Sequence, residues 1–332
     1  MAKEMMPIVN KPLVQYGVEE AIEAGLTGMW FVTGRGKHVI ADHFDISYEL
    51  ENQISGTDKE KYLMSIRAIQ AKGTFAFTRQ KAMKGLGHAI LTGESLMNND
   101  AFGVILADDL CITDAGEPNV MAQMVALYKQ FRCSIVAVME VPMEDTSKYG
   151  VISGSQLRDR IFQVNDMVEK PNPEDAPSNL AIIGRYILTP DIFDILRDTP
   201  PGKNGEIQIT DALQKQAQSG CVIAYKFKGR RFDCGSVDGY VAATNYVYEN
   251  IYQKNWFDVA PNRMIWGQNW GKKPIVPMLQ RGKARMPLNP SLQIDSAAGS
   301  KAVADSALTF RHPARSCRSA CRRILSGRRP CI

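Results

Sequence analysis

The sequence predicts an α/β protein with a doubly wound, mainly parallel Rossmann-like sheet. Two observations lead to this fold class. Over residues 1–255, short β-branched and aromatic runs alternate with amphipathic stretches, and no internal repeat interrupts them. Alternation of this kind is typical of a sheet whose two faces are covered by helices.

Four short apolar runs are predicted to be strands of this sheet, at residues 28–34, 74–80, 102–108 and 133–141. They are rich in β-branched and aromatic side chains, which favour strands. Between them, residues 13–25 and 118–130 carry apolar side chains at the spacing of a helix face. Strands and helices therefore alternate, as a doubly wound sheet requires.

A second group of apolar runs lies closer together along the chain, at residues 148–153, 161–171 and 180–189. We expect antiparallel strands here, forming a small sugar-binding subregion beside the first sheet. The segments that follow are predicted to be two helices, a strand and a last helix, at residues 190–198, 206–218, 222–229 and 236–252.

The charge divides the chain into two parts. From Trp256 to the end there are 14 Lys and Arg residues against 3 Asp, whereas residues 1–255 hold 26 basic and 32 acidic residues. The tail is rich in Pro, Gly, Ser and Arg and has no sustained periodicity, so it cannot offset its ordering entropy by burial. We predict one domain over residues 1–255 and a basic tail without regular structure over 256–332.

Cysteine usage and hydropathy suggest a cytoplasmic location. The seven cysteines stand singly, without the paired spacing of a zinc site or a disulfide framework. No stretch reaches the roughly 18 apolar residues of a membrane helix, so we expect no membrane partner. The basic tail has no aromatic or helical companion that reads nucleic acid, which argues against nucleic acid as a partner.

Two aspartates are candidate metal ligands. Asp108 ends an apolar run next to Asp109, and Asp233 precedes a glycine turn and a helix. Ligands gather at the carboxyl ends of the strands in this fold class, and Mg²⁺ prefers hard oxygen donors. The structural alternatives are a turn aspartate at 108 and a helix cap at 233.

An acid and a base adjoin in "VEKP", residues 168–171. At a strand end before proline both side chains can reach a cleft, where Glu169 accepts from sugar hydroxyls and Lys170 meets phosphate. The alternative is a solvated Glu and Lys. No histidine pairs with Ser or Cys in a nucleophile motif, so the sequence gives no support for acyl transfer.

The stretch "KAMKGLGHAI", residues 81–90, follows one predicted strand and precedes a helix-like run. Its two glycines permit close approach of the backbone to a ligand. It matches neither G-x-G-x-x-G, because Ile90 stands in the third glycine's place, nor a Walker A loop, because Lys84 precedes the glycines. The pattern leaves open a ligand loop and an ordinary turn.

In order along the chain, "KEMMPIVNKPLVQY", "RQKAMKGLGHAI", "YGVIS", "VEKP", "SNLAIIGRYIL", "GEIQITDAL" and "FDCG" resemble the bacterial UTP:glucose-1-phosphate uridylyltransferases of the sugar nucleotidyltransferase superfamily. The resemblance covers nearly all of residues 2–255. It implies a Mg²⁺-dependent transfer of a uridylyl group from UTP to glucose 1-phosphate, with release of pyrophosphate and no enzyme nucleophile. Catalysis then consists of alignment and charge neutralisation.

The resemblance also assigns roles to individual residues. Gln80 and Gly85 would contact the uracil ring, and Asp108 with Asp233 would hold Mg²⁺. Gly150, Glu169 and Gly184 would line the glucose. Lys170 would meet its phosphate, and Lys3 would lie near the triphosphate. Family members form homo-oligomers, which implies one here.

The sequence departs from the family at both ends. The family opens with a strand and a G-x-G-T-R loop around the triphosphate, whereas this sequence begins at "MAKEM". We therefore expect the first strand and Gly-rich loop to be missing, with unpaired edges on the neighbouring strands, poor folding and no transfer. The tail from Trp256 resembles nothing in the family and is typical of a shifted reading frame or a fusion.

Two other functions stay open from the sequence. The chain could be a catalytically silent relative that binds sugar nucleotide or regulates an active partner. It could also transfer a nucleotidyl group to another sugar 1-phosphate.

Overall fold

The computed structural model describes residues 2–97, 99–218, 220, 222–253 and 307–311. The chain forms two compact units, one of residues 1–245 and 303–332 and another of residues 246–302. The candidate site residues all belong to the first unit. The predicted tail, apart from residues 307–311, lies outside the described residues.

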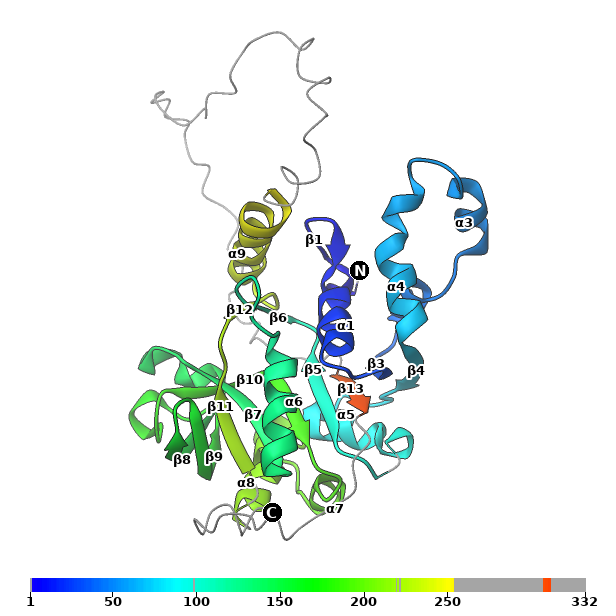
Figure 1. Ribbon diagram of the computed structural model, residues 1–332. Helices are drawn as coiled ribbons and strands as arrows, with labels where there is room; N and C mark the ends of the chain where they lie inside the picture. The colour runs from blue at the N-terminus through cyan, green and yellow to red at the C-terminus, as the bar shows by residue number, and fades with distance from the viewer. Residues whose placement is uncertain (1, 98, 219, 221, 254–306, 312–332) are drawn as a thin grey trace, which may run out of the picture. The chain divides into compact units, whose positions relative to one another are not determined.

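A mixed sheet forms the centre of the first unit, in the order β4-β3-β13-β5-β10-β7-β11-β9-β8 (Figure 1). From the pairings, β3, β4, β5, β7 and β11 point in one direction. The bounds are β3 Gly28–Thr33, β4 Thr74–Arg79, β5 Phe102–Leu106, β7 Ser134–Glu140, β8 Gly150–Arg158, β9 Ile161–Glu169, β10 Leu180–Leu188, β11 Val222–Lys226 and β13 Ala307–Arg311. The α/β fold class is confirmed.

The three predicted antiparallel strands are present as β8, β9 and β10, and they belong to the main sheet instead of lying beside it. Strands β8, β9 and β10 pair antiparallel with their neighbours, but β10 lies between β5 and β7 in the main sheet. The reason is visible in β10, where every residue from Ala181 to Leu188 is buried. A strand buried on both faces belongs in the middle of a covered sheet.

Strand β13 fills the place beside β3 and β5 where unpaired edges were expected (Figure 1). Its backbone pairs antiparallel with both, with Leu308 opposite Phe31 on one side and Ile105 on the other. The expectation of unpaired edges is therefore wrong. The prediction that the tail lacks regular structure is also wrong for residues 307–311. The backbone N–H and C=O groups of a buried strand edge need hydrogen-bond partners, and any extended segment can supply them.

Helices cover both faces of the sheet. One apolar cluster joins the sheet to α1 (Leu13–Glu23), α4 (Met64–Lys72) and α6 (Val120–Phe131). The other joins it to α5 (Gly85–Thr92), α7 (Ile192–Arg197) and α8 (Ile209–Ala217). Strand β7 shows the alternation that divides them, because Ile135 and Ala137 face the first cluster and Val136 and Val138 the second.

The remaining described elements lie outside the main sheet. A two-stranded sheet of β6 (Asp109–Ile112) and β12 (Arg230–Asp233) includes the segment that follows β5 along the chain. The others are η1 Lys3–Met5, β1 Pro7–Ile8, β2 Lys11–Pro12, α2 His38–Phe44, α3 Tyr48–Ile54, η2 Glu60–Tyr62, η3 Glu94–Leu96, η4 Met143–Lys148, η5 Pro173–Asp175, η6 Lys203–Gly205, α9 Val237–Val247 and η7 Tyr248–Tyr252. Among the described helices, none combines the length and apolar character needed to cross a bilayer.

Candidate active site

The β6–β12 pair brings the two predicted metal ligands together. Asp108 precedes β6, Asp233 ends β12, and the register places Asp233 opposite Asp109. Both carboxylates face Gly235. A Cβ atom there would lie 3.0 Å from Asp233 Oδ1 and 3.3 Å from Asp108 Oδ2. Only tertiary pairing creates this convergence, because 125 sequence positions separate the two residues.

Lys3 joins this carboxylate pair. Its Nζ donates to Asp108 Oδ2 at 3.1 Å, and each of the two side chains is about one third exposed, at 32% and 30%. An ammonium and a carboxylate that both remain open to solvent are available to a charged ligand. The structure thus brings Lys3, Asp108 and Asp233 to one place at the carboxyl edge of the sheet.

Asp109, the neighbour of Asp108, is buried and structural. Its Oδ1 accepts from Arg231 Nε at 2.9 Å, and its Oδ2 accepts from the Gly184 amide at 2.8 Å. Burial raises the pKa of Asp109, and the guanidinium of Arg231 opposes that rise. Gly184 is required beside it, since a Cβ would lie only 2.6 Å from Asp109 Oδ2. Gly184 thus holds the Asp109 side chain in place, next to Asp108 in the chain.

Two of the three predicted sugar-binding residues, Gly150 and Glu169, form a second group, whereas Gly184 lies against Asp109. Gly150 pairs with Glu169 across β8 and β9, and Thr210 Oγ1 at the start of α8 donates to Glu169 Oε2 at 2.7 Å. A Cβ on Gly150 would lie 3.0 Å from that hydroxyl oxygen and 3.1 Å from the carboxylate. A glycine at 150 therefore leaves room beside Glu169.

Lys170 stands at the end of β9 with a left-handed backbone, at a φ of +48°. Its amide donates to the carbonyl of Tyr149 at 2.9 Å, and its Nζ lies 3.7 Å from Glu169 Oε1. A non-glycine residue in this region is unfavourable and persists where surrounding structure imposes it. Here the strand end brings the Lys170 ammonium beside the Glu169 carboxylate.

Arg231 connects the two groups. It donates through Nη1 to the hydroxyl of Tyr149 at 2.9 Å, and its Nη2 lies 3.7 Å from Asp233 Oδ2. Tyr149 in turn holds the Lys170 amide. Arg231 thus joins Asp109 to Tyr149 by hydrogen bonds and pairs with Asp233 through charge alone.

Gln80 and Gly85 form a third group, at the start of α5. Gln80 Nε2 donates to Gly85 O at 3.2 Å and lies 2.9 Å from His88 Nδ1. Gly85 has a φ of +86°, and a Cβ there would lie 2.8 Å from Glu206 Cβ. The glycine spacing of this loop therefore serves close packing against residues 206–207, which the sequence pattern did not reveal.

Sequence reasoning did not assign four residues that hold the predicted site residues in place: His88, Tyr149, Thr210 and Arg231. Each lies inside or next to a stretch that matched the family, so the motifs contained them. Their importance rests on contacts between segments distant in the chain, for which a single sequence carries no signal.

No nucleophile is evident in the site. Cys234 lies next to Asp233, but burial raises the pKa of its thiol to about 12, so the reactive thiolate is scarce. In the described part of the chain, no cluster of three or more His, Cys, Asp or Glu side chains is arranged to hold a metal ion. A metal here would take two protein carboxylates and obtain its other ligands from substrate and water.

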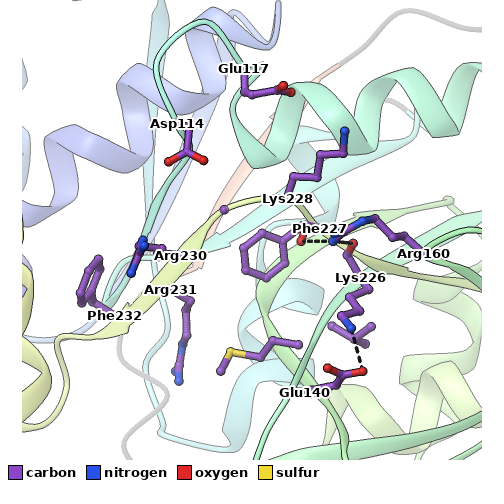
Figure 2. Close-up of a pocket in the computed structure, with 13 residues that line it drawn as sticks. Asp114, Glu117, Glu140, Arg160, Lys226, Phe227, Lys228, Arg230, Arg231 and Phe232 are labelled. Carbon is purple, nitrogen blue, oxygen red and sulfur yellow. Dashed lines mark hydrogen bonds and ion pairs between the residues drawn. The ribbon is translucent and has the colours of Figure 1, made fainter.

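A cavity of about 680 Å³ is lined by residues of β12, by the segment after β6 and by the ends of β7 and β11 (Figure 2). Of the site residues described above, Arg231 alone lines it. Lys226 Nζ pairs with Glu140 Oε1 at 2.7 Å, and Arg160 donates to the carbonyl of Phe227 at 3.4 Å. Its volume is suitable for a ligand, but the predicted site residues lie elsewhere.

Comparison with known proteins agrees with this geometry. The family model described as "Nucleotidyl transferase" matches residues 1–250. A UTP–glucose-1-phosphate uridylyltransferase of Pseudomonas aeruginosa is 68% identical over 253 residues, which are 76% of this chain and 90% of the relative. One from Bacillus subtilis is 42% identical over 244 residues, 74% of this chain and 82% of the relative.

Solved structures give the same match. A UDP-glucose pyrophosphorylase complexed with UDP-glucose superposes with a TM-score of 0.69 at 60% identity, covering 74% of this chain and 90% of that one. A UTP-bound UGPase from Acinetobacter baumannii has a TM-score of 0.69 at 32% identity and covers 77% and 90% of the two chains.

Proposed function

Because the chain belongs to the nucleotidyl transferase family, in the branch of the UTP–glucose-1-phosphate uridylyltransferases, we propose that its site transfers a uridylyl group from UTP to glucose 1-phosphate. The observation that carries this proposal is the convergence of Lys3, Asp108 and Asp233 at the strand ends. An ammonium and two carboxylates at one place suit the phosphates of the two substrates and a divalent cation between them.

The residues present fit a divalent cation. Asp108 and Asp233 offer hard carboxylate oxygens to one small space beside Gly235, the donor type that Mg²⁺ prefers. We propose that these two carboxylates hold Mg²⁺, with phosphate oxygens and water as its remaining ligands. When bound, the ion neutralises charge on the triphosphate.

The reaction needs no group of the chain as nucleophile. A phosphate oxygen of glucose 1-phosphate forms a bond to the α-phosphorus of UTP, and the bond from that phosphorus to the bridging oxygen of pyrophosphate breaks. Lys170, at the sugar side, holds the attacking phosphate, and Lys3 lies near the triphosphate. Alignment of two anions and neutralisation of their repulsion supply the rate enhancement.

The sugar and the base have separate places. Glu169, fixed by Thr210, accepts from glucose hydroxyls, with Gly150 as the small residue beside it. Gly184, which the family resemblance assigns to the glucose, acts through Asp109 instead. Gln80 and the backbone N–H of Gly85 meet the uracil ring. The Gly85 N–H is available for this contact because the first amides of a helix have no intrahelical acceptor. Residues 205–210 link this base site to the sugar site, since they pack on Gly85 and carry Thr210.

The remaining expectations are proposals of the same kind. We propose residues 1–255 as the catalytic domain, 256–332 as a segment outside the family, a homo-oligomer, and a cytoplasmic location. The cysteines support the last, because Cys111 and Cys234 are free thiols.

Pyrophosphate release from UTP, glucose 1-phosphate and Mg²⁺ tests the function directly. We expect turnover in the ordinary enzymatic range of about 1–1,000 per second. Asp233→Asn should lower kcat/KM at least about 100-fold, because it removes a carboxylate proposed to hold the charge-neutralising Mg²⁺. The matched control is Asp238→Asn, an exposed aspartate in the first turn of α9, which should leave kcat/KM unchanged.

The same assay separates the alternatives. Binding of UDP-glucose without turnover would support the silent relative. Faster turnover of a different sugar 1-phosphate would replace glucose as substrate. The comparisons favour neither alternative, because the similar proteins carry the uridylyltransferase name.

A further inference from the structure

The side-chain amide of Gln80 is held in one orientation. Its Nε2 lies 3.2 Å from the carbonyl oxygen of Gly85 and 2.9 Å from His88 Nδ1. A carbonyl oxygen can only accept, so the atom facing it must be the NH₂ group. One amide hydrogen is directed to Gly85 O, and the second is directed to His88 Nδ1.

His88 must then be an acceptor at Nδ1, which places its ring proton on Nε2. This requires the neutral imidazole. Burial lowers the pKa of His88, and the nearby charge of Lys84 lowers it further. Both effects keep Nδ1 free to accept at neutral pH.

The other end of the Gln80 amide is uncommitted. Its Oε1 has no hydrogen-bond partner among the described residues, and it is not one of their buried unpartnered atoms, so it is open to solvent. Reversing the amide would set Oε1 against the Gly85 carbonyl, two acceptors in contact, and would lose both hydrogen bonds. Gln80 therefore presents a hydrogen-bond acceptor outward at the start of α5.

We propose that His88 is a positioning residue that makes the site select uracil over cytosine, by fixing Gln80 with its Oε1 toward the base. The inference rests on the proposed function, in which Gln80 meets the base of the nucleotide. Uracil joined to ribose through N1 has a single ring donor, N3–H, so this is the group that Oε1 accepts from. Cytosine in the same pose has an unprotonated N3, an acceptor facing an acceptor.

The test compares two variants of nearly equal size. His88→Leu removes the acceptor at Nδ1, whereas His88→Asn can keep one there in its side-chain carbonyl. The control is His38→Leu, the same chemical change at an exposed histidine on α2. For each protein, kcat/KM is measured with UTP, CTP and dTTP against glucose 1-phosphate, together with calorimetric binding of UDP-glucose and a circular dichroism melt.

We expect His88→Leu to reduce the UTP/CTP ratio of kcat/KM by about ten-fold, because one of the two hydrogen bonds that hold the amide is lost, and turning the NH₂ group to cytosine N3 then sacrifices only the bond to Gly85 O. The UTP/dTTP ratio should stay unchanged, since thymine also carries N3–H. His88→Asn should restore most of the UTP/CTP ratio, and His38→Leu should not alter it.

An unchanged UTP/CTP ratio in a folded His88→Leu protein would overturn the inference and leave the proposed function intact, even if overall activity fell. Failure of His88→Asn to restore the ratio would also overturn it. If His88→Leu does not fold, His88→Ala provides the same comparison. A wild-type chain that neither turns over UTP nor binds UDP-glucose would refute the proposed function, and the inference with it.

Discussion

Arg185 and Glu20 form a buried ion pair in which Nη2 lies 2.8 Å and Nε 3.0 Å from Glu20 Oε2. Their side chains are 1% and 7% exposed. Arg185 also donates to the carbonyl of Asp109 at 2.9 Å, and Glu20 accepts from the amide of Met121 at 3.0 Å. The pair therefore ties α1, α6 and β10 to the turn that carries Asp108, the proposed metal ligand.

Removing one partner of this pair should be costly. Glu20→Ala leaves a buried guanidinium without its counter-charge, so we expect the free energy of unfolding to fall by about 3–5 kcal/mol. Urea denaturation followed by circular dichroism measures it. Glu23→Ala on the same helix removes only an exposed contact with Asn119 and should cost under about 1 kcal/mol; equal losses for both would contradict the argument.

Gly184 is predicted to tolerate no side chain. In Gly184→Ala the new Cβ would lie 2.6 Å from both Asp109 Oδ2 and Leu106 Cβ, so Asp109 must move. We expect a loss of about 1–3 kcal/mol in stability and a fall in kcat/KM, because the displaced turn carries Asp108. Gly34→Ala is the control, since its Cβ would meet nothing closer than 4.0 Å. An active and stable Gly184→Ala protein would show that the turn can adjust.

Two substitutions at Lys170 distinguish the effect of its charge from the effect of its backbone strain. Lys170→Asn removes the ammonium but suits the left-handed backbone at φ +48°, whereas Lys170→Met removes the charge and keeps the strain. Both should lower kcat/KM by about 100-fold or more. Lys170→Asn should be the more stable of the two in thermal melts. Activity near wild type in either variant would remove Lys170 from the phosphate site.

Acid should destabilise the fold through His43. Burial lowers the pKa of this histidine below its usual 6.5, and one ring nitrogen, Nε2, lies 3.0 Å from Gln15 Oε1. Below pH 6.5 the unfolded chain binds more protons than the folded one, so stability is present above that pH and is lost as the pH falls. Melting temperatures between pH 7 and 5 should fall less steeply in His43→Asn; an identical slope would rule out a contribution from His43.

Local pattern accounts for most elements of this fold. The predicted strand at residues 28–34 is β3, and the predicted helix at 118–130 is α6 within two residues. Helix α6 even begins where its sequence indicates, since Asn119 caps it by accepting from the amide of Ala122 at 2.8 Å. Such signals lie within a few residues of one another, so a single sequence carries them.

Strand order lies beyond that range. The run at residues 180–189 was correctly predicted as a strand, yet its place between β5 and β7 was not. Residues 307–311 have no local signal that assigns them to the centre of a sheet, and their pairing with β3 and β5 depends on a demand for backbone partners that arises elsewhere in the chain. Pairing between distant segments leaves no mark in either segment alone.

The site divides in the same way. The sequence by itself determined the chemical types: carboxylates at 108 and 233, a lysine and a glutamate at a strand end, and a glutamine before two glycines. Tertiary structure alone decided that Arg231 joins Asp109 to Tyr149 and that His88 fixes the amide of Gln80. Hydrogen-bond direction is a property of two atoms in space, and it exists only once folding has brought them together.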